Sequence, residues 1–400
     1  CSPCELKSLT GKKFLELIQR EFKLFFNNKV LLMLFLGAPV LYGVLVGHVY
    51  QQGKVTQMPI IVVDEDNSPL SSSFIDMLSD NESIEVARVL PSLFDSKDIA
   101  MQYEATTIVH IPKGFASGVQ QGRLPEMTVF VDGANTLTSN TAMMAVNVCA
   151  STLKAGIQIQ AQMKRGVPAK IAAQQYEPFK TTFVKQNIRS GNYLYFMLPG
   201  VLITVLQQVL LLGLALSFSS EFEGNTFPEL VRKIGNPIGL ILVKILPYVL
   251  MSVGILVLYW GFGQYYRMPL QAEFGRFVLC TFVFLLAVCF IGVLVSILLP
   301  SQLKSTEVLM VIATPAFILS GFTWPSSLMP GWVQAIANVI PSTHYLRIFR
   351  LMFIQHAENY HTDKALIALT IIMIISFILA VIILWLKIRK IKKEDKKISV

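Results

Sequence analysis

The stretch "YLYFMLPGVLITVLQQVLLLGLALSF" (residues 193–218) carries no charged side chain over a length that suffices to cross a lipid bilayer. A helix needs about 20 mainly apolar residues to span the hydrocarbon core. Comparable apolar runs recur at residues 30–50, 238–263, 277–299, 308–322 and 365–386. The sequence therefore predicts an α-helical integral membrane protein with six transmembrane helices.

Composition and charge agree with this class. The 400 residues are 53% hydrophobic and 15% charged, whereas about 25% of residues are charged in a typical soluble protein. The formal net charge is +9, but the basic residues gather before the first run and after the last. Basic flanks of membrane spans mark the cytoplasmic side. We therefore expect both termini in the cytoplasm and no nucleic-acid partner.

This orientation assigns a side to every connecting segment. Residues 51–190 and 323–364 fall outside, and residues 219–237 and the basic tail 387–400 fall inside. The outer segment 323–364 is apolar but interrupted by three prolines, which predicts re-entrant or short surface-lying helices. Residues 12–29 alternate apolar and charged positions with helical spacing, which favours an amphipathic helix in the membrane interface over a plain cytoplasmic helix.

The region 51–190 is predicted to form an external α/β domain. Four short apolar segments have strand character, and helical segments separate them. The expected strands are residues 59–64, 84–90, 106–111 and 127–131. The expected helices are residues 71–79, 95–103 and 113–121, followed by one long helix over 136–165. Residues 1–11, which contain Cys1 and Cys4, are interpreted as a leader or an artefact, since a zinc site needs about four ligands.

Signals for catalysis or metal binding are missing. The sequence has no Walker A phosphate loop, no GxSxG and no HExxH motif. The acidic stretch "VDEDNSPL" (residues 63–70) lacks the spacing of a calcium loop and is better explained as a turn leading into a helix. Neither catalytic nor metal-ligating residues are expected. The apolar runs contain no carboxylate in their interiors, which disfavours an ion-coupled transporter and a membrane enzyme.

Two polar features within the apolar part remain open to interpretation. Gln207 and Gln208 are the most polar pair inside a predicted span, and they could line a translocation path or form hydrogen bonds at a helix interface. Lys244 lies near the cytoplasmic end of its span, where its side chain is expected to extend toward water.

The segment "EFEGNTFPEL" (residues 221–230) places three carboxylates between two apolar runs on the cytoplasmic side. Pro228 and Pro237 limit the length of any helix here. A short charged helix facing the cytoplasm is typical of a docking surface for a nucleotide-driven partner. The alternative is a solvated loop without a partner.

Three segments resemble those of ABC-2 type transporter permeases. "SEFEGNTFPEL" (residues 220–230) is similar to the family's "REXERGTXEXL", with Asn225 in place of a glycine and Pro228 in place of an acid. "NPIGLILVKILPY" (residues 236–248) resembles the next family segment. Residues 319–350 are similar to the signature after the fifth span, where the matching residues are Ser320, Gly321, Phe322, Pro325, Met329, Pro330, Pro341, Thr343, Tyr345 and Arg350. The outer domain resembles the subgroup with a large insert after the first span.

The resemblance implies a permease that pairs with a second, identical or similar permease and with a cytosolic ATPase. ATP and magnesium would bind to that ATPase, and this chain would bind no cofactor. Residues 12–29 would be the elbow helix, and contact with the ATPase would involve Glu221, Glu223, Thr226, Glu229 and Leu230. The protein would lie in the bacterial inner membrane, and a periplasmic membrane-fusion adaptor is a further partner that the resemblance suggests.

The predicted function is export of a hydrophobic or amphipathic compound, with drug, lipid, peptide and natural product all left open. The alternative is a membrane receptor or immunity-type protein that binds through its external domain without transport. That alternative predicts no ATPase partner, and it predicts that changes at Glu221 and Glu223 are tolerated.

Overall fold

The computed structural model describes residues 11–176, 188, 191–268 and 273–398. The predicted leader with Cys1 and Cys4 lies outside the described residues. The chain forms two compact units, each with its own core. Unit 1 comprises Cys1–Gly53 and Lys185–Val400, and unit 2 comprises Lys54–Val184. Unit 2 is therefore inserted into unit 1 in the chain, within the region for which the sequence predicts an α/β domain.

Unit 2 is built on a four-stranded sheet with the order β2-β1-β3-β4. Strand β1 pairs in parallel with β2 and β3, whereas β3 pairs with β4 antiparallel. Ile60 to Val63 of the central strand are all fully buried, which explains why it is a continuous apolar run. The strands, which agree with the predicted ones within a residue at each end, are β1 (Met58–Asp64), β2 (Ile84–Leu90), β3 (Thr107–Ile111) and β4 (Thr128–Val131).

Helices cover both faces of this sheet. The long helix α7 buries Ala142, Val146 and Leu153 in one core with Ile60 and Val109 of the sheet. Ala100 of α5 packs into a second core on the opposite face. The helices of unit 2 are α4 (Pro69–Ser79), α5 (Ser96–Gln102), α6 (Phe115–Gln120), α7 (Thr136–Lys164) and α8 (Ala169–Tyr176).

The acidic stretch of unit 2 forms a turn and a helix start. The buried carboxylate of Asp64 accepts hydrogen bonds from the backbone of Asp66 and Asn67 and from the Ser71 hydroxyl. Ser68 and Ser71 then form a reciprocal cap at the start of α4. Within the described residues, no three His, Cys, Asp or Glu side chains are grouped so that they could hold a metal ion.

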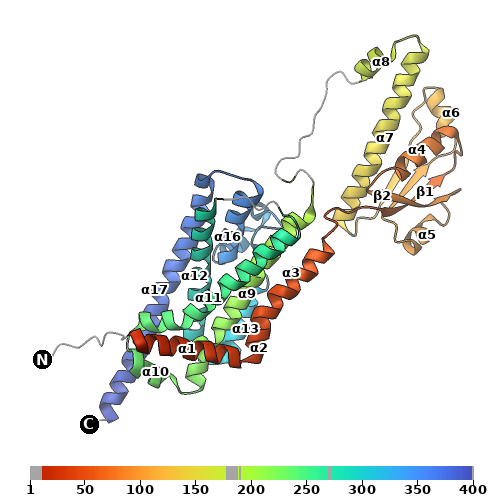
Figure 1. Ribbon diagram of the computed structural model, residues 1–400. Coiled ribbons are helices and arrows are strands. Elements are labelled where there is room, and N and C mark those ends of the chain that lie inside the picture. The colour runs from red at the N-terminus through yellow and green to blue at the C-terminus, as the bar shows by residue number, and fades with distance from the viewer. Residues whose placement is uncertain (1–10, 177–187, 189–190, 269–272, 399–400) are drawn as a thin grey trace. The chain divides into compact units, whose positions relative to one another are not determined.

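Unit 1 is a helical bundle centred on α9, which packs against α3, α11, α12 and α13, while α17 packs on α12. Figure 1 shows α1 lying across the bundle rather than along it. The principal helices are α1 (Gly11–Asn27), α2 (Lys29–Leu32), α3 (Ala38–Val49), α9 (Tyr193–Glu223), α10 (Phe227–Ile234), α11 (Pro237–Tyr265), α12 (Phe274–Leu298), α13 (Gln302–Ala313), α14 (Ala316–Leu319) and α17 (Asn359–Ile398). A π-helical turn, Met33–Gly37, joins α2 to α3.

Prolines divide the segment between α14 and α17 into short helices. A 3-10 turn (Ser326–Leu328) follows Pro325, α15 (Gly331–Ala337) follows Pro330, and α16 (Pro341–Phe349) begins at Pro341. Proline suits these starting positions because the first backbone N–H groups of a helix have no partner inside it. A π-helical turn, Arg350–Ile354, continues α16.

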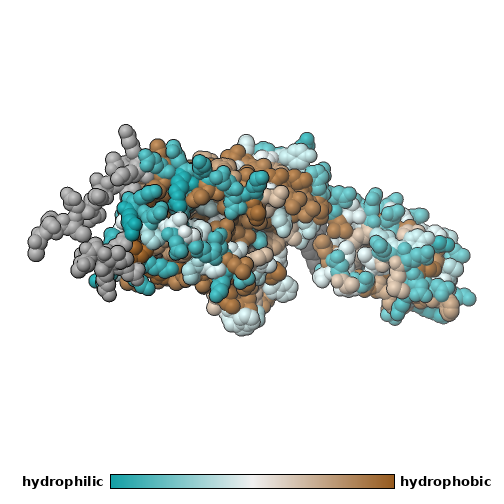
Figure 2. Space-filling view, turned by 90° about the horizontal axis from the view of Figure 1, so that it is seen from below, coloured by the Kyte–Doolittle hydropathy of each residue, from teal (hydrophilic) through white to brown (hydrophobic). Residues whose placement is uncertain are grey.

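Seven helical stretches of the described chain are long and apolar enough to cross a membrane. One of them is α7, whose apolar face belongs to the core of unit 2. The six stretches in unit 1 are Lys29–Val49, Tyr193–Glu223, Pro237–Tyr265, Phe274–Leu298, Gln302–Leu319 and Asn359–Lys393. Figure 2 shows broad hydrophobic areas on unit 1, whereas the visible face of unit 2 is mostly hydrophilic.

Two of these stretches differ most in extent from the predicted spans. The fifth starts earlier than predicted, at Gln302, and is divided at Thr314–Pro315 into α13 and α14. The last helix extends beyond both ends of the predicted residues 365–386, from Asn359 to Ile398. Half of the residues between 387 and 398 are lysine, which favours helix as strongly as many apolar residues do. Hydropathy located the apolar part of each helix but not its polar ends.

Candidate functional site

A buried cluster of ion pairs joins three helices of unit 1. Lys244 of α11 lies between Glu21 of α1 and Glu221 of α9. Its Nζ is 2.9 and 3.0 Å from the two carboxylate oxygens of Glu21, and 2.7 Å from Oε1 of Glu221. The side chains are 1%, 8% and 2% exposed for Lys244, Glu21 and Glu221. The three donors of the ammonium group are thus matched by three carboxylate oxygens.

Arg20 and Thr226 extend this cluster toward its surface. The Arg20 guanidinium lies 3.0 Å from Oε1 of Glu221, and the Thr226 hydroxyl donates to the other oxygen of Glu221. Burial alone would lower the pKa of Arg20, but its hydrogen bond and attraction to Glu221 outweigh that effect and raise the pKa. The two cations and two carboxylates cancel in formal charge. We call Arg20, Glu21, Glu221 and Lys244 the ionic cluster.

The ionic cluster ties the movements of its helices together. Removing one member of a buried ion pair is strongly unfavourable, because it leaves an uncompensated charge. Displacement of α1 away from α11, or of the C-terminal end of α9 away from either, would separate Lys244 from a carboxylate. These three helix segments are therefore expected to move as one piece.

Aromatic packing supports the same junction. The Tyr248 ring, one turn beyond Lys244 on α11, makes edge contacts with Phe25 of α1 and with Phe35. Its hydroxyl donates to the backbone carbonyl of Gly213, 3.0 Å away on α9. A Cβ atom at Gly213 would lie 2.7 Å from the Tyr248 ring, so the close contact of α9 with α11 requires glycine there.

Lys244 does not extend toward water as the sequence suggested. Lys244 lies inside an apolar run, and its surroundings are polar only because Glu21 of α1 and Glu221 of α9 contact its ammonium group. Sequence reasoning missed Glu21 and Arg20 altogether. The available signal was the isolated Lys244 in "GLILVKILPY", since a charge within a span needs a partner of opposite sign.

Helix α10 lies between Glu221 and Lys244 in the chain and has two distinct faces. Phe227, Leu230, Val231 and Ile234 are buried against the bundle. Glu229 and Lys233 are exposed on the opposite face. The spacing of the buried positions is that of one helical face. The exposed face of α10 is therefore the charged surface beside the ionic cluster.

The predicted coupling residues separate into an inner and an outer group. Glu221 and Leu230 are buried, and Thr226 is hydrogen-bonded to Glu221. Glu221 is thus not on the surface, contrary to its predicted role as a directly contacted acid. Glu223 is exposed, and its carboxylate accepts hydrogen bonds from the backbone and side chain of Gln302 at the start of α13. Glu229 is exposed on α10.

The two departures from the family pattern fit the local backbone. Asn225 has a φ of +52°, in the left-handed region that glycine adopts freely and asparagine adopts more readily than most residues. Pro228 lies in the first turn of α10, where its missing N–H costs no hydrogen bond. Both substitutions therefore preserve the turn and the helix that follows it.

Gln207 is fully buried where α9 meets α16. Its carbonyl oxygen accepts a 2.8 Å hydrogen bond from the backbone N–H of Ser342 in the first turn of α16, whereas its Nε2 has no partner among the described residues. The hydrogen bond is of the kind that the helix-interface interpretation describes, and a role in a translocation path stays a prediction. Gln208 is half-buried, and its side chain makes no hydrogen bond within the described part of the chain.

The predicted external signature holds the short helices on the bundle. Arg350 donates to the carbonyls of Gly321 and Phe322, and its guanidinium lies over the Phe322 ring. Gly321 has a φ of +72°, a conformation that favours glycine. Phe322 stacks on Phe196 of α9 with ring centroids 4.7 Å apart. The signature residues at this turn therefore have a structural role.

Tyr345 and the prolines complete this arrangement. Tyr345 of α16 stacks on Phe284 of α12, and its hydroxyl is 2.7 Å from that of Thr281. Pro325, Pro330 and Pro341 each stand at the start of a short helical element. The signature thus fixes α16 against α9 and α12.

Comparison with known proteins matches residues 29–387 to the model of the ABC-2 family transporter proteins. The chain is 22% identical over 331 residues to a protein of Escherichia coli strain K12 named probable multidrug ABC transporter permease YbhR, covering 80% of this chain and 84% of that protein. It is 24% identical over 202 residues to the probable multidrug ABC transporter permease YbhS of the same strain, covering 49% of this chain and 52% of that protein. Since the family model covers most of the sequence, this chain belongs to the ABC-2 family of transporter proteins.

Proposed function

We propose that the chain is the permease subunit of an ATP-driven exporter in the bacterial inner membrane. Six spans correspond to the six long apolar stretches of unit 1, with α7 left outside the membrane because its apolar face is used in the core of unit 2. Both termini face the cytoplasm, and unit 2 lies on the periplasmic side, as the distribution of basic residues favours. Helix α1 would be the interfacial elbow helix.

The observation that carries this proposal is the ionic cluster behind α10. A partner that pushes on the exposed face of α10 acts next to Glu221, and Glu221 is paired with Lys244 of α11 and Arg20 of α1. A local displacement would therefore be passed to two long helices and to α1 together. Glu223 adds a connection from the end of α9 to the start of α13. This arrangement suits a subunit that receives work from the cytoplasm.

The partners follow from the family. A cytosolic ATPase would bind ATP and magnesium and contact α10 through Glu229 and neighbouring exposed residues. A second permease, identical or similar, would complete the transporter, and a periplasmic membrane-fusion adaptor would meet unit 2. The cargo would be a hydrophobic or amphipathic compound, in keeping with the multidrug permeases that the chain resembles. Closure of the ATPase would shift the permease pair between two conformations.

Affinity purification from the native membrane tests the partnership. Exchanging the charges on the outer face of α10, by Glu229→Lys with Lys233→Glu, is expected to reduce ATPase recovery about tenfold relative to wild type. The matched control is Glu82→Lys, an exposed glutamate of unit 2, which should leave recovery unchanged. Surface residues are chosen because a change at buried Glu221 would also destabilise the fold.

Each outcome of this purification has a separate meaning. Recovery of an ATPase with wild type and control but not with the exchange variant supports contact through α10. Equal recovery with all three would move the contact elsewhere in the molecule. Absence of any ATPase, under detergent conditions that preserve other ABC complexes, would contradict export and favour a receptor.

A further inference from the structure

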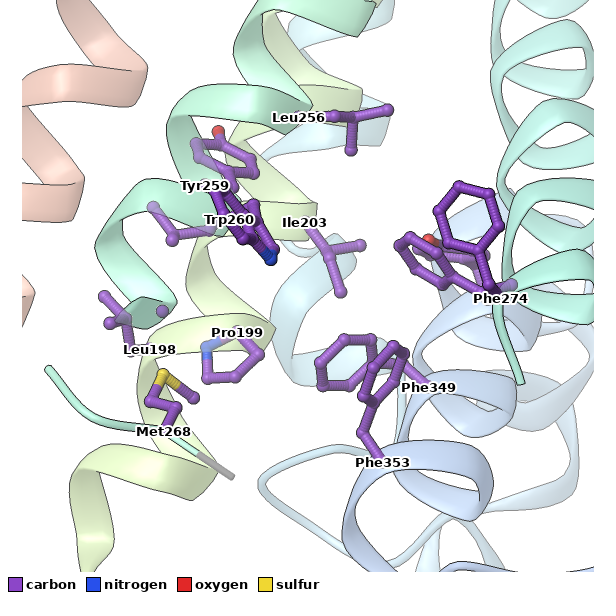
Figure 3. Close-up of a pocket in the computed structure, with 14 residues that line it drawn as sticks. Leu198, Pro199, Ile203, Leu256, Tyr259, Trp260, Met268, Phe274, Phe349 and Phe353 are labelled. Atoms are coloured by element: carbon purple, nitrogen blue, oxygen red, sulfur yellow. The ribbon is translucent and has the colours of Figure 1, made fainter. Parts of the chain in front are cut away.

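A cavity of about 240 Å³ lies within unit 1, at the opposite end of α9 and α11 from the ionic cluster. Its walls come from α9, α11, the start of α12, and α16 with the π-helical turn that follows it. Figure 3 shows Ile203 near the middle, with Tyr259 and Trp260 on one side and Phe349, Phe353 and Phe274 on the other. We call this space, centred on Ile203, the aromatic cavity.

The lining is aromatic and carries no charge. Seven of the 14 lining residues are aromatic, and the other seven are aliphatic residues, methionine, proline and glycine. Of the two lining hydroxyl groups, that of Tyr345 is paired with Thr281, and that of Tyr259 is buried without a partner among the described residues. An anion would have to leave water without finding a partner here, which is strongly unfavourable, and a cation would find only the faces of aromatic rings in place of its hydration shell. The lining therefore selects a neutral apolar ligand.

The volume limits the ligand to a small ring system. A cavity of about 150 Å³ lined by apolar side chains binds benzene, and drug-sized ligands occupy about 300–1,000 Å³. A space of about 240 Å³ falls between these values and fits about two fused rings. A phospholipid or a whole drug molecule would extend well beyond it.

The arrangement of rings favours an aromatic ligand over an alkyl chain of equal size. Phe349 and Phe353 form a stacked pair with centroids 4.5 Å apart, and Phe277 meets Phe353 edge-on at 5.2 Å. An inserted ring can continue such stacked and edge contacts, which stabilise beyond the burial of area alone. An alkyl chain gains only from burial.

The cavity reaches the surface of the bundle beside apolar helix faces. Trp260 and Phe274, which line it, are 62% and 78% exposed. Val253 and Val257 on the same helix as Trp260 are also exposed and apolar. A ligand that has already partitioned into the bilayer could therefore enter from the side.

From size, neutrality and ring geometry together, we propose that the aromatic cavity binds the fused two-ring aromatic portion of a neutral lipophilic compound arriving from the bilayer. The biological sense of the site rests on the proposed export function, since the bound compound would be cargo. Binding itself requires neither the ATPase nor transport, so the two proposals can be tested separately.

The test uses the purified full-length permease in phosphatidylcholine nanodiscs with 2-acetyl-6-(dimethylamino)naphthalene, a neutral fluorescent two-ring compound. Energy transfer from tryptophan to this probe, corrected for empty nanodiscs, reports binding, and Trp260 is the tryptophan that lines the cavity. The signal is expected to saturate. It should be displaced by 2-methylnaphthalene but not by decane.

Ile203→Phe fills the cavity and is expected to weaken probe binding about tenfold, since the introduced phenyl ring occupies the space that the probe needs. The matched control is Val311→Phe, which adds a ring at an exposed position on α13, a helix that contributes no lining residue, and should leave affinity within about twofold. A folded Ile203→Phe protein with unchanged affinity would overturn the proposal. Displacement by decane as strong as by methylnaphthalene would also overturn it and indicate an acyl-chain site.

A second variant keeps the test decisive if Ile203→Phe does not fold. Phe353→Ala enlarges the cavity and should shift its preference from naphthalene toward anthracene, whereas an unchanged preference would place binding elsewhere. Vesicle transport gives the separate test of function. Saturable binding without ATP-dependent movement of the probe would support the binding site and contradict the export function. Transport without saturable binding would support export and contradict the binding site.

Discussion

The two ends of α9 and α11 are built in opposite ways. At one end, the ionic cluster is buried, charged and fully paired, with Lys244 only 1% exposed. At the other end, the aromatic cavity is uncharged and leaves about 240 Å³ unfilled. Ile203 and Glu221 lie on the same helix, roughly 27 Å apart along its axis. One continuous helix therefore connects a paired junction to an unfilled apolar space.

This contrast indicates how one bundle can combine rigidity with adaptability. Buried ion pairs have few alternative arrangements, because each charge needs its partner at a fixed distance. Apolar side chains around a void can change rotamers with little loss, since their contacts are non-directional. The ionic cluster is therefore suited to transmit displacement, and the aromatic cavity to accept ligands of somewhat different shape.

The largest expected effect is at Lys244. Lys244→Met leaves Glu21 and Glu221 facing each other without a cation between them, and should lower the free energy of unfolding by about 3–5 kcal/mol. The measurement is thermal or denaturant unfolding of the purified permease in detergent. A loss below about 1 kcal/mol would mean that the junction is not held by its charges.

The same substitution at a lysine that has no buried carboxylate partner provides the control. Lys387 on α17 is half-buried, and its Nζ donates to the backbone carbonyl of Ile297 and lies over the Phe222 ring. Lys387→Met should cost only about 1–2 kcal/mol, since no buried carboxylate is left unpaired. Combining Lys244→Met with Glu21→Gln and Glu221→Gln should recover a large part of the loss.

The next effect is expected at Gln207, between the two ends. Gln207→Leu removes the acceptor for the backbone N–H of Ser342 and should cost about 1–3 kcal/mol. Gln208→Leu is the control, because the side chain of Gln208 makes no hydrogen bond within the described residues. Equal stability of the two variants would mean that the hydrogen bond from Ser342 to Gln207 does not stabilise the fold. The interpretation of Gln207 as part of a translocation path would then be favoured.

The contrast between the two ends also explains what the sequence could predict. Hydropathy located the apolar helices, and short apolar segments located all four strands of unit 2, because both patterns reflect local burial. Gln207 and Lys244 stood out as polar residues in apolar runs. Their partners, Ser342 and Glu21, lie 135 and 223 positions away in the chain, so local patterns carried no information about them.

Residues 221–230, which are predicted to contact an ATPase, show the same limit. Their three acids look equivalent in sequence, yet Glu221 is buried in the ionic cluster, Glu223 binds Gln302 and Glu229 is exposed. Which acid faces inward depends on how α9 ends and α10 begins. That turn uses the left-handed conformation of Asn225, which a periodicity argument does not include. The aromatic cavity could likewise not be predicted from local sequence patterns, since its walls come from four separated segments of the chain.

A smaller effect is expected when a paired hydroxyl is removed at the rigid end. Tyr248→Phe deletes the hydrogen bond to the carbonyl of Gly213 but keeps the ring against Phe25 and Phe35. The expected loss is about 0.5–1.5 kcal/mol in the free energy of unfolding. A loss as large as that of Lys244→Met would show that this hydroxyl, and not the ion pairs, dominates the junction.

The smallest effect is expected for the same substitution at the opposite end. The Tyr259 hydroxyl is buried and has no partner among the described residues, so its desolvation is not offset by a hydrogen bond. Tyr259→Phe should therefore leave stability unchanged or raise it by up to about 1 kcal/mol. Paired unfolding measurements on Tyr248→Phe and Tyr259→Phe compare the two ends with identical chemistry. If Tyr259→Phe were the more damaging of the two, the cavity end would contain a polar interaction as important as those of the ionic cluster, and the division into a paired end and an adaptable end would be wrong.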